Sequence, residues 1–312
     1  MIDILLATYN GGEYLEEQLN SILRQSYTNW HLIVRDDCSS DDTQKILRTY
    51  VMKYPDRITL SINEFPFGSA KGNFIRLLKD VKHEYAMFCD QDDIWDKDKI
   101  ETTFRCMRQL ERKLGKKYPI LVSTDLRVVN SKGNIMADSF LKYMNLPDKI
   151  VLNNLLIQNN VTGCTVLMNK TLCEMLKKVK NSNKILMHDH FAALIAAVFG
   201  KAVILNKSTI SYRQHESNSV GAVDAQSVAY MWQRFKRGRK KFREDIGLSA
   251  VQTEYFLKLY GKYMENNKKE KRLLFEYSCL LQKRKKDKII FFIKYNVLKY
   301  GWIRKVMQII WC

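Results

Sequence analysis

Carboxylates gather behind two apolar segments in the first third of the chain. They are Asp36, Asp37, Asp90, Asp92 and Asp93. Like charges in one place repel each other unless a cation lies among them, and Mg²⁺ in proteins takes one or two carboxylates together with phosphate oxygens. The pattern therefore predicts a site where a divalent cation bridges carboxylates and a diphosphate. Asp41 and Asp42, in contrast, are expected to be ordinary loop and helix-capping residues.

A second polar group stands directly before the apolar segment 191–199 and consists of His188, Asp189 and His190. A carboxylate beside two imidazoles at the start of a helix can be positioned as a general base. The alternative is that Asp189 is a helix N-cap with two incidental histidines. A zinc site is not expected, because positions i and i+2 do not share a helix face and no further ligand stands nearby.

Strands and helices must bring these side chains together. Short apolar runs predict strands at 2–7, 31–34, 58–62, 85–89 and 120–123. Apolar residues at helical spacing predict helices at 14–23, 43–54, 71–81, 100–114 and 191–199, with an irregular, mobile stretch at 130–148. Strands that alternate with helices indicate βαβ crossovers and a mostly parallel sheet. Ligands bind such sheets beyond the carboxyl ends of the strands, so the carboxylates should meet at one edge.

Several classes of protein are disfavoured because the sequence lacks the motifs that are typical of them. It has no GxxxxGK[ST] phosphate loop and no GxGxxG, which disfavours kinases and dehydrogenases. The loop TYNGGEYL carries no basic residue, which disfavours a nucleotidyltransferase. The seven cysteines include no C-x-x-C pair, so neither a disulfide scaffold nor a zinc ribbon is expected. No apolar run reaches the roughly 18 residues of a membrane-spanning helix, and MIDILLATYN has no features of an export signal.

The chain is basic, and its charge is concentrated towards the C-terminus. The formal net charge is +19, and residues 226–312 contain 22 Lys and Arg against 7 Asp and Glu, or +15. A helix over 289–312 would gather these residues on one stripe, with apolar and aromatic residues elsewhere: Lys294, Gly301, Arg304, Lys305 and Gln308. This pattern is typical of a helix in the membrane interface. The alternative is a helix packed on the preceding domain with a solvated basic face, while nucleic-acid binding is disfavoured because no such module is recognisable.

The first 225 residues resemble a known family. The segments TYNGGEYLEEQLNSILRQSYTNWHLIVRDDCSSDDT and FCDQDDIWDKDKI are similar to glycosyltransferase family 2, whose members have the GT-A fold. VTGCTVLMNK, MHDHFAALIAAVFG and ISYRQHESNSVGA look most like its bacterial rhamnosyltransferase-type branch, which builds surface polysaccharides such as capsule. The resemblance implies an α/β, Rossmann-like GT-A domain, with a mostly parallel sheet flanked by helices. A basic helical C-terminal extension would follow it.

The resemblance also assigns site residues by position. Those implied to bind the nucleotide-sugar are Thr8, Tyr9, Asn10, Asp37, Lys71, Asn73, Asp90 and Asp93. Asp92 is implied to hold the Mg²⁺ or Mn²⁺ that bridges the diphosphate. His215 would touch the metal or close over the diphosphate, unless it is a surface-loop histidine. Asp189 matches the position of the catalytic base, although His-Asp-His stands here in place of the family's Glu-Asp pair.

The implied activity is inverting, metal-dependent transfer of one sugar. The donor would be dTDP-rhamnose or a UDP-hexose, and the acceptor a bacterial surface polysaccharide on a polyprenyl diphosphate. Residues 1–110 would form the nucleotide-sugar-binding half, 111–225 the acceptor-binding half, and 226–312 a membrane-associating region. The family's processive members carry Q-x-x-R-W, which is broken at 233–237, so one sugar per encounter is expected. The expected location is the cytoplasm, on the inner face of the cell membrane.

A different class of function remains as the alternative. The chain would then be a non-catalytic membrane- or nucleic-acid-binding protein with a degenerate transferase domain. A degenerate domain is expected to lose at least one carboxylate of the set implied by the family. All four are present: Asp37, Asp90, Asp92 and Asp189. The sequence therefore favours the enzyme.

Overall fold

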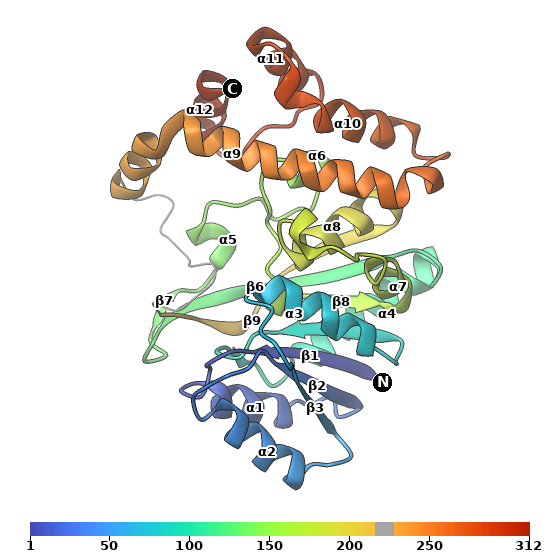
Figure 1. Cartoon of the computed structure of the whole chain (residues 1–312), viewed down its shortest axis with the longest axis vertical. Coiled ribbons are helices and arrows are strands. Elements are labelled where there is room, and N and C mark those ends of the chain that lie inside the picture. The colour runs from blue at the N-terminus through green and yellow to red at the C-terminus, as the bar shows by residue number, and fades with distance from the viewer. Residues whose placement is uncertain (216–227) are drawn as a thin grey trace.

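A central β-sheet organises the molecule (Figure 1). The computed structural model describes residues 1–215 and 228–312, with side chains over 1–215 and 238–312. Within these ranges the sheet has nine strands in the order β3-β2-β1-β4-β8-β6-β9-β5, and β7 pairs with β6. The strands are β1 (Ile2–Thr8), β2 (Trp30–Asp36), β3 (Ile58–Ile62), β4 (Tyr85–Cys89), β5 (Ile94–Trp95), β6 (Ile120–Asn130), β7 (Ile135–Ala137), β8 (Leu167–Asn169) and β9 (Lys201–Gln214).

The strands β3, β2, β1 and β4 form a parallel half of the sheet. Helices α1 (Leu15–Leu23) and α2 (Thr43–Lys53) pack on the face that carries Ile4 and Leu6 of β1. Helix α3 (Ala70–Leu77) packs on the opposite face, which carries Leu5. Because both faces are covered, these strands are continuous apolar runs rather than alternating ones. The α/β prediction is confirmed, and the carboxyl ends of β1, β2 and β4 lie at one edge.

The other half of the sheet is mixed. Strand β8 runs antiparallel to both β4 and β6, β5 runs antiparallel to β9, and β6 and β9 are parallel. Helices around this half are α4 (Lys99–Leu114), α7 (Lys170–Leu176) and α8 (His188–Phe199). The alternation of strands and helices does not predict the direction of β5 or β8, because these two- and three-residue strands leave almost no periodic signal.

The irregular stretch predicted at 130–148 is wrong in part. It contains β7, which pairs with β6, and the short helix α5 (Phe140–Tyr143). The helix begins where the side chain of Ser139 accepts a hydrogen bond from the backbone N–H of Lys142, 3.1 Å away. A further short helix, α6 (Leu152–Leu155), follows. This segment therefore forms a structured wall beside the sheet.

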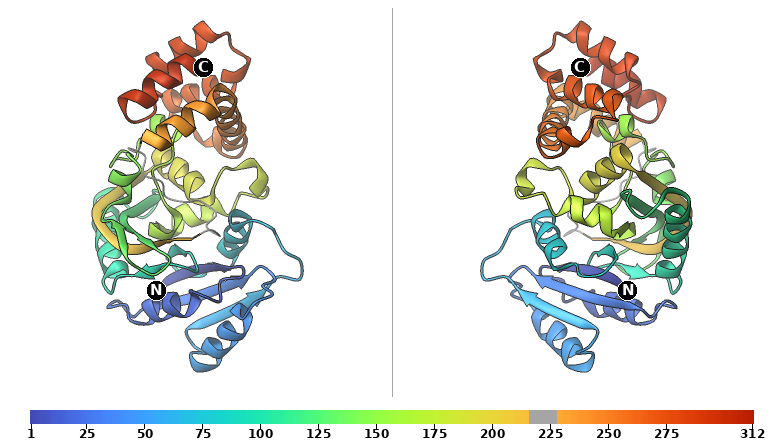
Figure 2. Two further views of the ribbon diagram at one scale, coloured as in Figure 1. Left: turned by 90° about the vertical axis from the view of Figure 1, so that its left-hand side faces the viewer. Right: turned by 90° about the vertical axis from the view of Figure 1, so that its right-hand side faces the viewer.

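Four helices complete the described chain: α9 (Val228–Tyr260), α10 (Lys268–Ser278), α11 (Lys285–Lys294) and α12 (Trp302–Trp311). They form a layer at the end of the molecule opposite α1 and α2 (Figure 2). Aromatic side chains join this layer to the sheet domain, since the rings of Phe256 in α9 and Phe191 in α8 are 5.8 Å apart. No described helix is both long and apolar enough to cross a membrane.

The prediction of one continuous helix over 289–312 is wrong. The chain breaks between α11 and α12, where Asn296 and Gly301 have positive φ angles of 48° and 87°. Such angles interrupt a right-handed helix, and glycine adopts them at the lowest cost. The apolar segment is therefore two short helices that meet at an angle.

The predicted polar stripe of this segment is only partly solvated: Lys294 and Lys305 are exposed, but two other members of the stripe face inward. Arg304 and Gln308 of α12 are buried, not solvated. The guanidinium group of Arg304 donates hydrogen bonds to the carbonyl oxygens of Met144 and Asn145, at 2.9 and 2.7 Å. These carbonyls follow α5, so tertiary hydrogen bonds hold the polar side of α12 inward. Its apolar side is exposed as a consequence.

Candidate active site

A cavity of about 950 Å³ opens at the carboxyl ends of the parallel strands and reaches the C-terminal helices. Its lining at the sheet end includes these predicted site residues: Thr8, Tyr9, Asp37, Asn73, Asp90, Asp92 and Asp189. They come from the ends of β1, β2 and β4, from α3 and from α8. This volume lies at the upper end of what small-molecule sites occupy, so there is room for more than one substrate.

The loop after β1 is held open by side chains from two neighbouring loops. The amide of Gln91 accepts a hydrogen bond from the backbone N–H of Tyr9 (2.8 Å) and donates one to its carbonyl oxygen (3.0 Å). Asn10 has a φ of 46°, its N–H donates to the hydroxyl of Ser39, and its side-chain oxygen accepts from the N–H of Ser40. The ring of Tyr9 is left 57% exposed at the cavity. It offers a flat face on which an aromatic base can stack.

Asp37 is buried and orders the loop that closes the cavity beside it. Its carboxylate accepts hydrogen bonds from the side chain of Asn63 (2.7 Å) and from the backbone N–H groups of Phe67 (2.7 Å) and Gly68 (3.1 Å). Three donors leave one of roughly four acceptor positions for a ligand. Asp37 therefore lines the cavity and also holds the adjacent loop in place, and the sequence motif does not indicate this second role.

Asn73 and Lys71, both assigned to the nucleotide, lie in different surroundings. Asn73 lines the cavity, and its amide donates to the carbonyl oxygen of Arg35 at 3.0 Å. Lys71 is not among the lining residues, and its ammonium group donates to the carbonyl oxygen of Ile185 at 3.0 Å. The structure does not bring Lys71 together with the other site residues. It instead ties α3 to the segment before α8.

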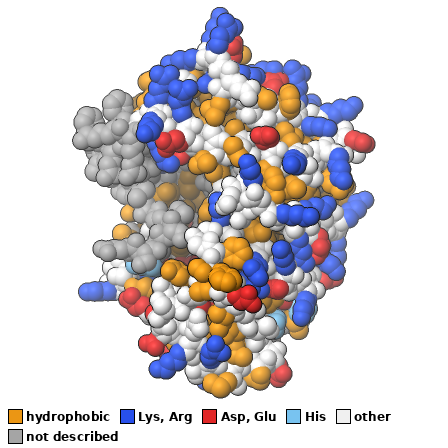
Figure 3. Space-filling model, in the orientation of Figure 1, with side chains coloured by type: hydrophobic (Ala, Val, Ile, Leu, Met, Phe, Trp, Pro, Cys, Tyr) orange, Lys and Arg blue, Asp and Glu red, His pale blue; other side chains and the backbone are white. Residues whose placement is uncertain are grey.

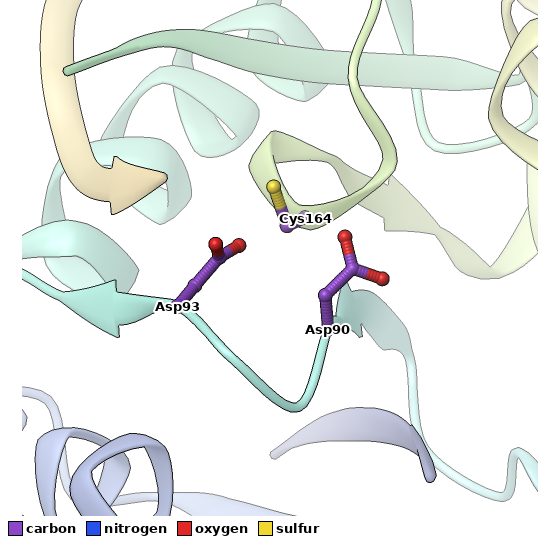
Figure 4. A group of neighbouring side chains, drawn as sticks. All are labelled: Asp90, Asp93 and Cys164. Atoms are coloured by element: carbon purple, nitrogen blue, oxygen red, sulfur yellow. The ribbon is translucent and has the colours of Figure 1, made fainter. Parts of the chain in front are cut away.

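Asp90 and Asp93 stand in the turn after β4, and the side chains of both lie near that of Cys164 (Figure 4). Their ligand atoms lie within 4.8 Å of one another. Burial, then the neighbouring Asp92 and Asp189, raises the pKa of Asp90 to about 7. Burial and the charges of Asp92 and Asp90 also raise the pKa of Asp93 well above its ordinary value. This crowding of carboxylates is energetically unfavourable without a cation.

Asp93 itself does not line the cavity. It is fully buried behind the turn, where one oxygen accepts a 3.3 Å hydrogen bond from the N–H of Arg213. Its other oxygen has no hydrogen-bond partner among the described residues. Cys164 is buried, and burial holds the pKa of its thiol well above the ordinary value, so it is not a reactive thiolate.

His215 lies at the end of β9 and meets Asp92 across the cavity mouth. Its Nε2 atom is 2.8 Å from Oδ2 of Asp92, and its ring lies 5.0 Å from that of Tyr14. Arg213 fixes the same corner, because its guanidinium group pairs with Glu17 and donates to the carbonyl oxygen of Asp92 at 3.0 Å. An imidazole and a carboxylate that lie this close together can both coordinate the same metal ion.

Asp189 occupies the first turn of α8, on the opposite side of the cavity from the β1 loop. Its carboxylate accepts a 2.5 Å hydrogen bond from the N–H of His190, which follows it in the chain. Burial raises the pKa of Asp189 to about 7. A carboxylate with this pKa takes up a proton readily near neutral pH, which is the property of a general base.

The two histidines beside Asp189 differ in their hydrogen bonds. His190 is buried with its Nε2 2.6 Å from the carbonyl oxygen of Leu155. His188 is equally buried and stacks on Phe74 with ring centres 4.1 Å apart, yet neither of its ring nitrogens has a partner. Burial lowers the pKa of His188 to about 3, so the ring is neutral. The two rings therefore have separate surroundings.

The carboxylate set is chemically suited to a divalent cation. Asp93 has an unpartnered buried oxygen, and the pKa values of both Asp90 and Asp93 are raised by their neighbours. A hard cation with oxygen ligands would relieve both features. Asp90, Asp92 and His215 could hold such a cation next to the cavity, while the ligand atoms of Asp90, Asp93 and Cys164 form a second, more buried set.

Three residues of this site were missed by the sequence analysis. Gln91 lies inside the D-x-D motif and bridges it to Tyr9. A Cβ atom at Gly163 would lie 2.9 Å from Nε2 of His188 and 3.6 Å from a carboxylate oxygen of Asp189, so this position needs glycine. Arg213 anchors the end of β9. Only Gly163 carried a signal, as a glycine inside an otherwise apolar segment.

The chain is similar to known sugar-transferring proteins. The family described as Glycosyl transferase family 2 has a sequence model that matches residues 3–114. A dTDP-rhamnosyl transferase, RfbG of Shigella flexneri, is 34% identical over 229 residues, which cover 70% of this chain and 74% of that protein.

A second relative and a solved structure extend the comparison. The UDP-Glc:alpha-D-GlcNAc-diphosphoundecaprenol beta-1,3-glucosyltransferase WfgD of Escherichia coli is 33% identical over 174 residues, which cover 55% of this chain and 61% of that protein. The crystal structure of residues 1–349 of TarS from S. aureus in complex with UDP superposes with a TM-score of 0.55 at 18% identity. That match covers 81% of this chain and 65% of the TarS chain.

Proposed function

The chain belongs to glycosyl transferase family 2 and has the GT-A fold, and on this premise we propose that it is an inverting, metal-dependent enzyme that transfers one sugar per encounter. The observation that carries the proposal is the position of Asp189. Its carboxylate lines the same cavity as Asp90 and Asp92, and has a pKa raised to about 7 by burial. The proposed base and the proposed diphosphate-binding residues thus face the same cavity. This arrangement suits a displacement reaction at the anomeric carbon of a sugar held between them.

In the proposed reaction Asp189 accepts the proton of an acceptor hydroxyl. The oxygen of that hydroxyl attacks the anomeric carbon, and the bond between this carbon and the β-phosphate oxygen breaks with its electron pair on the diphosphate. A single displacement from the face opposite the leaving group inverts the anomeric configuration. No covalent enzyme intermediate is needed, because the attacking and leaving groups lie on opposite sides.

Donor binding is assigned to the edge formed by the β1, β2 and β4 loops. We assign the base and ribose to the part of the cavity lined by Thr8, Tyr9, Asp37 and Asn73, and Asn10, which is not itself a lining residue, adjoins it in the β1 loop. Tyr9 presents an exposed ring there, and Asp37 keeps one acceptor position. The candidate donors are dTDP-rhamnose and a UDP-hexose. The relative RfbG, a dTDP-rhamnosyl transferase, supports the first, and WfgD, a UDP-Glc-dependent glucosyltransferase, supports the second.

The proposed metal is Mg²⁺ or Mn²⁺, held by Asp92 and His215 with Asp90 beside them. When bound it would supply the positive charge that stabilises the departing diphosphate. Asp93 supports this edge from behind, since its buried carboxylate contacts the backbone N–H of Arg213. The 2.8 Å contact between His215 and Asp92 supports the pair as ligands of one ion.

We propose a glycan on polyprenyl diphosphate as the acceptor, in the assembly of a bacterial surface polysaccharide. The similarity to WfgD, a glucosyltransferase whose acceptor is a GlcNAc-diphosphoundecaprenol, supports this choice. Residues 1–110 would bind the donor, 111–225 the acceptor and 226–312 the membrane. The boundary at 225, the end of ISYRQHESNSVGA and the side chains of 233–237 lie outside the described residues.

The outer face of the C-terminal layer supports attachment to an anionic membrane surface. On α12 the exposed apolar residues Trp302, Val306 and Ile310 follow one another at four-residue intervals, so they share one face. The ammonium group of Lys285 in α11 donates to the carbonyl oxygen of Ile310 at 3.0 Å, which places a basic helix end beside them. Figure 3 shows Lys and Arg side chains, with hydrophobic ones between them, over this end of the molecule. Such a surface suits the cytoplasmic leaflet.

Release of nucleoside diphosphate from a panel of sugar nucleotides tests the proposal. The wild-type protein is compared with Asp92→Asn in the presence of Mg²⁺ or Mn²⁺, with and without a membrane extract as the source of acceptor. Turnover of one donor that is lost with chelator and reduced at least a hundredfold in the variant would support the enzyme and identify the sugar. Equal turnover by the variant, or none with any donor and extract, would refute it.

A further inference from the structure

The same cavity also has a lining from the helices beyond the sheet, and we call this part of it the helical end. Its wall is built by α5, the segment after α6, and α9. The apolar side chains that face it are Phe140, Leu146, Ile157, Phe242, Ile246 and Leu248. Because the sheet end already contains the residues proposed for the donor, the helical end lies on the acceptor side of Asp189. Its lining is therefore a guide to what the acceptor carries next to its reactive sugar.

Several polar groups of the helical end are engaged in internal hydrogen bonds, whereas the side-chain oxygen of Asn160, which also lines the cavity, is buried without a partner among the described residues. Ser249 donates to the carbonyl oxygen of Leu156 at 2.7 Å, and the hydroxyl of Tyr277 donates to the same oxygen at 2.5 Å. The side-chain oxygen of Gln158 accepts from the N–H of Tyr300 at 3.0 Å. A sugar ring needs many partners for its hydroxyl groups, and this wall provides few. A hydrocarbon chain needs none and gains from apolar burial.

Two cations stand at the same end. Lys299 and Arg304 line the cavity and are each 8% exposed. The ammonium group of Lys299 lies 5.3 Å from the ring centre of Phe242, so positive charge and apolar wall are adjacent. Asp245 is the carboxylate that the described lining contributes at this end, and it is paired with Lys241 at 3.0 Å. The local charge therefore favours an anion beside an apolar group.

We propose that the helical end binds the isoprenoid diphosphate of a lipid-linked acceptor, with the first part of the chain against α9 and the diphosphate near Lys299 and Arg304. This inference rests on the proposed function and gives its acceptor a place. Helix α12 connects the two surfaces involved, since Arg304 lines the cavity while Trp302 and Ile310 of the same helix are exposed. A lipid in the membrane would reach the cavity beside this helix.

Binding of farnesyl diphosphate, a short soluble isoprenoid diphosphate, tests the assignment. The measurement is made below its micelle concentration with saturating UDP or dTDP and Mg²⁺, so that the donor edge is occupied. We expect saturable binding that nucleotide does not displace, and binding of farnesol and of inorganic diphosphate that is at least tenfold weaker. The absence of saturable binding, displacement by nucleotide, or farnesol binding as tightly would overturn the proposal.

Matched variants locate the site. Leu248 is 56% exposed and lines the helical end, whereas Val251, on the same helix and 39% exposed, does not. Leu248→Asp should weaken the binding of farnesyl diphosphate at least tenfold, and Lys299→Gln should weaken it at least fivefold. Val251→Asp should change this affinity less than twofold. The melting temperature of each variant verifies that it is folded, and Leu248→Gln replaces the aspartate variant if it is not. Equal effects at positions 248 and 251 would contradict the assignment.

Failure of this inference is distinguishable from failure of the proposed function. Release of nucleoside diphosphate from the sugar nucleotide is measured on the same wild-type preparation and does not depend on farnesyl diphosphate. A protein that turns over its donor but does not bind the probe at the helical end would refute only the lipid site. A protein that binds the probe but turns over no donor would refute only the proposed reaction.

Discussion

Nε2 of His215 lies 2.8 Å from Oδ2 of Asp92, although the two residues are 123 positions apart in the chain. The contact joins the end of β9 to the turn after β4, and both side chains are about nine-tenths buried from solvent. A carboxylate and an imidazole so placed form the core of the proposed metal site. His215 would thus be a third metal ligand beside Asp90 and Asp92 of the D-x-D motif, contributed by the second half of the domain.

Removal of the His215 imidazole should weaken binding of the metal ion and leave binding of the nucleotide unchanged. His215→Ala is expected to raise the Mn²⁺ concentration for half-maximal activity at least tenfold, because loss of one ligand or its orienting partner costs that much. The measurement is a titration of activity with Mn²⁺ at saturating donor. His31→Ala is the control, since His31 lies beside the buried Asp3 on the other side of the sheet domain. An unchanged metal requirement in His215→Ala would remove His215 from the site.

The activity should depend on pH through Asp189. Burial raises the pKa of this carboxyl to about 7, so below pH 7 it is increasingly protonated and cannot accept the proton of the acceptor. We expect kcat/KM to rise with pH between 5.5 and 8, with a midpoint near 7 and a roughly tenfold loss per pH unit below it. The same raised pKa means that the folded state gains stability as pH falls from 7 towards 4. A flat profile from pH 5.5 to 8 would contradict the role of Asp189.

The two buried histidines should respond differently to removal of their nitrogens. His190→Phe loses a 2.6 Å contact with the carbonyl oxygen of Leu155 and is expected to lower the free energy of unfolding by about 1–3 kcal/mol. His188→Phe loses no hydrogen bond and keeps its stacking on Phe74, so its stability should be unchanged or higher. Chemical denaturation of both variants measures the difference. Equal destabilisation would mean that His188 has partners in solution.

The exposed face of α12 should control membrane attachment. Trp302 is 75% exposed, as is Met52 on α2 at the opposite end of the molecule. Trp302→Gln is expected to reduce binding to vesicles that contain anionic lipid at least fivefold, whereas Met52→Gln should have no effect, because Trp302 shares its exposed face with the apolar residues Val306 and Ile310. Co-sedimentation at low and high salt provides the measurement. Equal binding by wild type and Trp302→Gln would exclude α12 from the contact.

Much of this site could be predicted from the sequence because its residues follow strand ends. The parallel half of the sheet has long apolar strands, so its carboxyl edge and the positions of Asp37, Asp90 and Asp92 in one cavity were foreseeable. Asp189 was foreseeable from the resemblance together with the helix that follows it. The position of Lys71 apart from the other site residues could not be predicted, because the carbonyl group that its ammonium group contacts lies 114 residues away in the chain.

The C-terminal helices illustrate the limit of periodicity. The polar stripe of α12 was visible in the sequence, but a stripe does not state whether it faces solvent or protein. The carbonyl groups after α5 and the buried amide of Gln308 decide the orientation, since they satisfy the polar side from within. Long-range hydrogen bonds of this kind leave no local pattern.

The central claim is that Asp189 removes the proton from the acceptor. The most direct test compares wild type with Asp189→Asn in two assays on the same preparation: transfer of sugar to acceptor, and equilibrium binding of the nucleoside diphosphate with metal. We predict a loss of at least a thousandfold in transfer, with nucleotide affinity within threefold of wild type. Transfer within tenfold of wild type would contradict the claim and place the base elsewhere in the cavity.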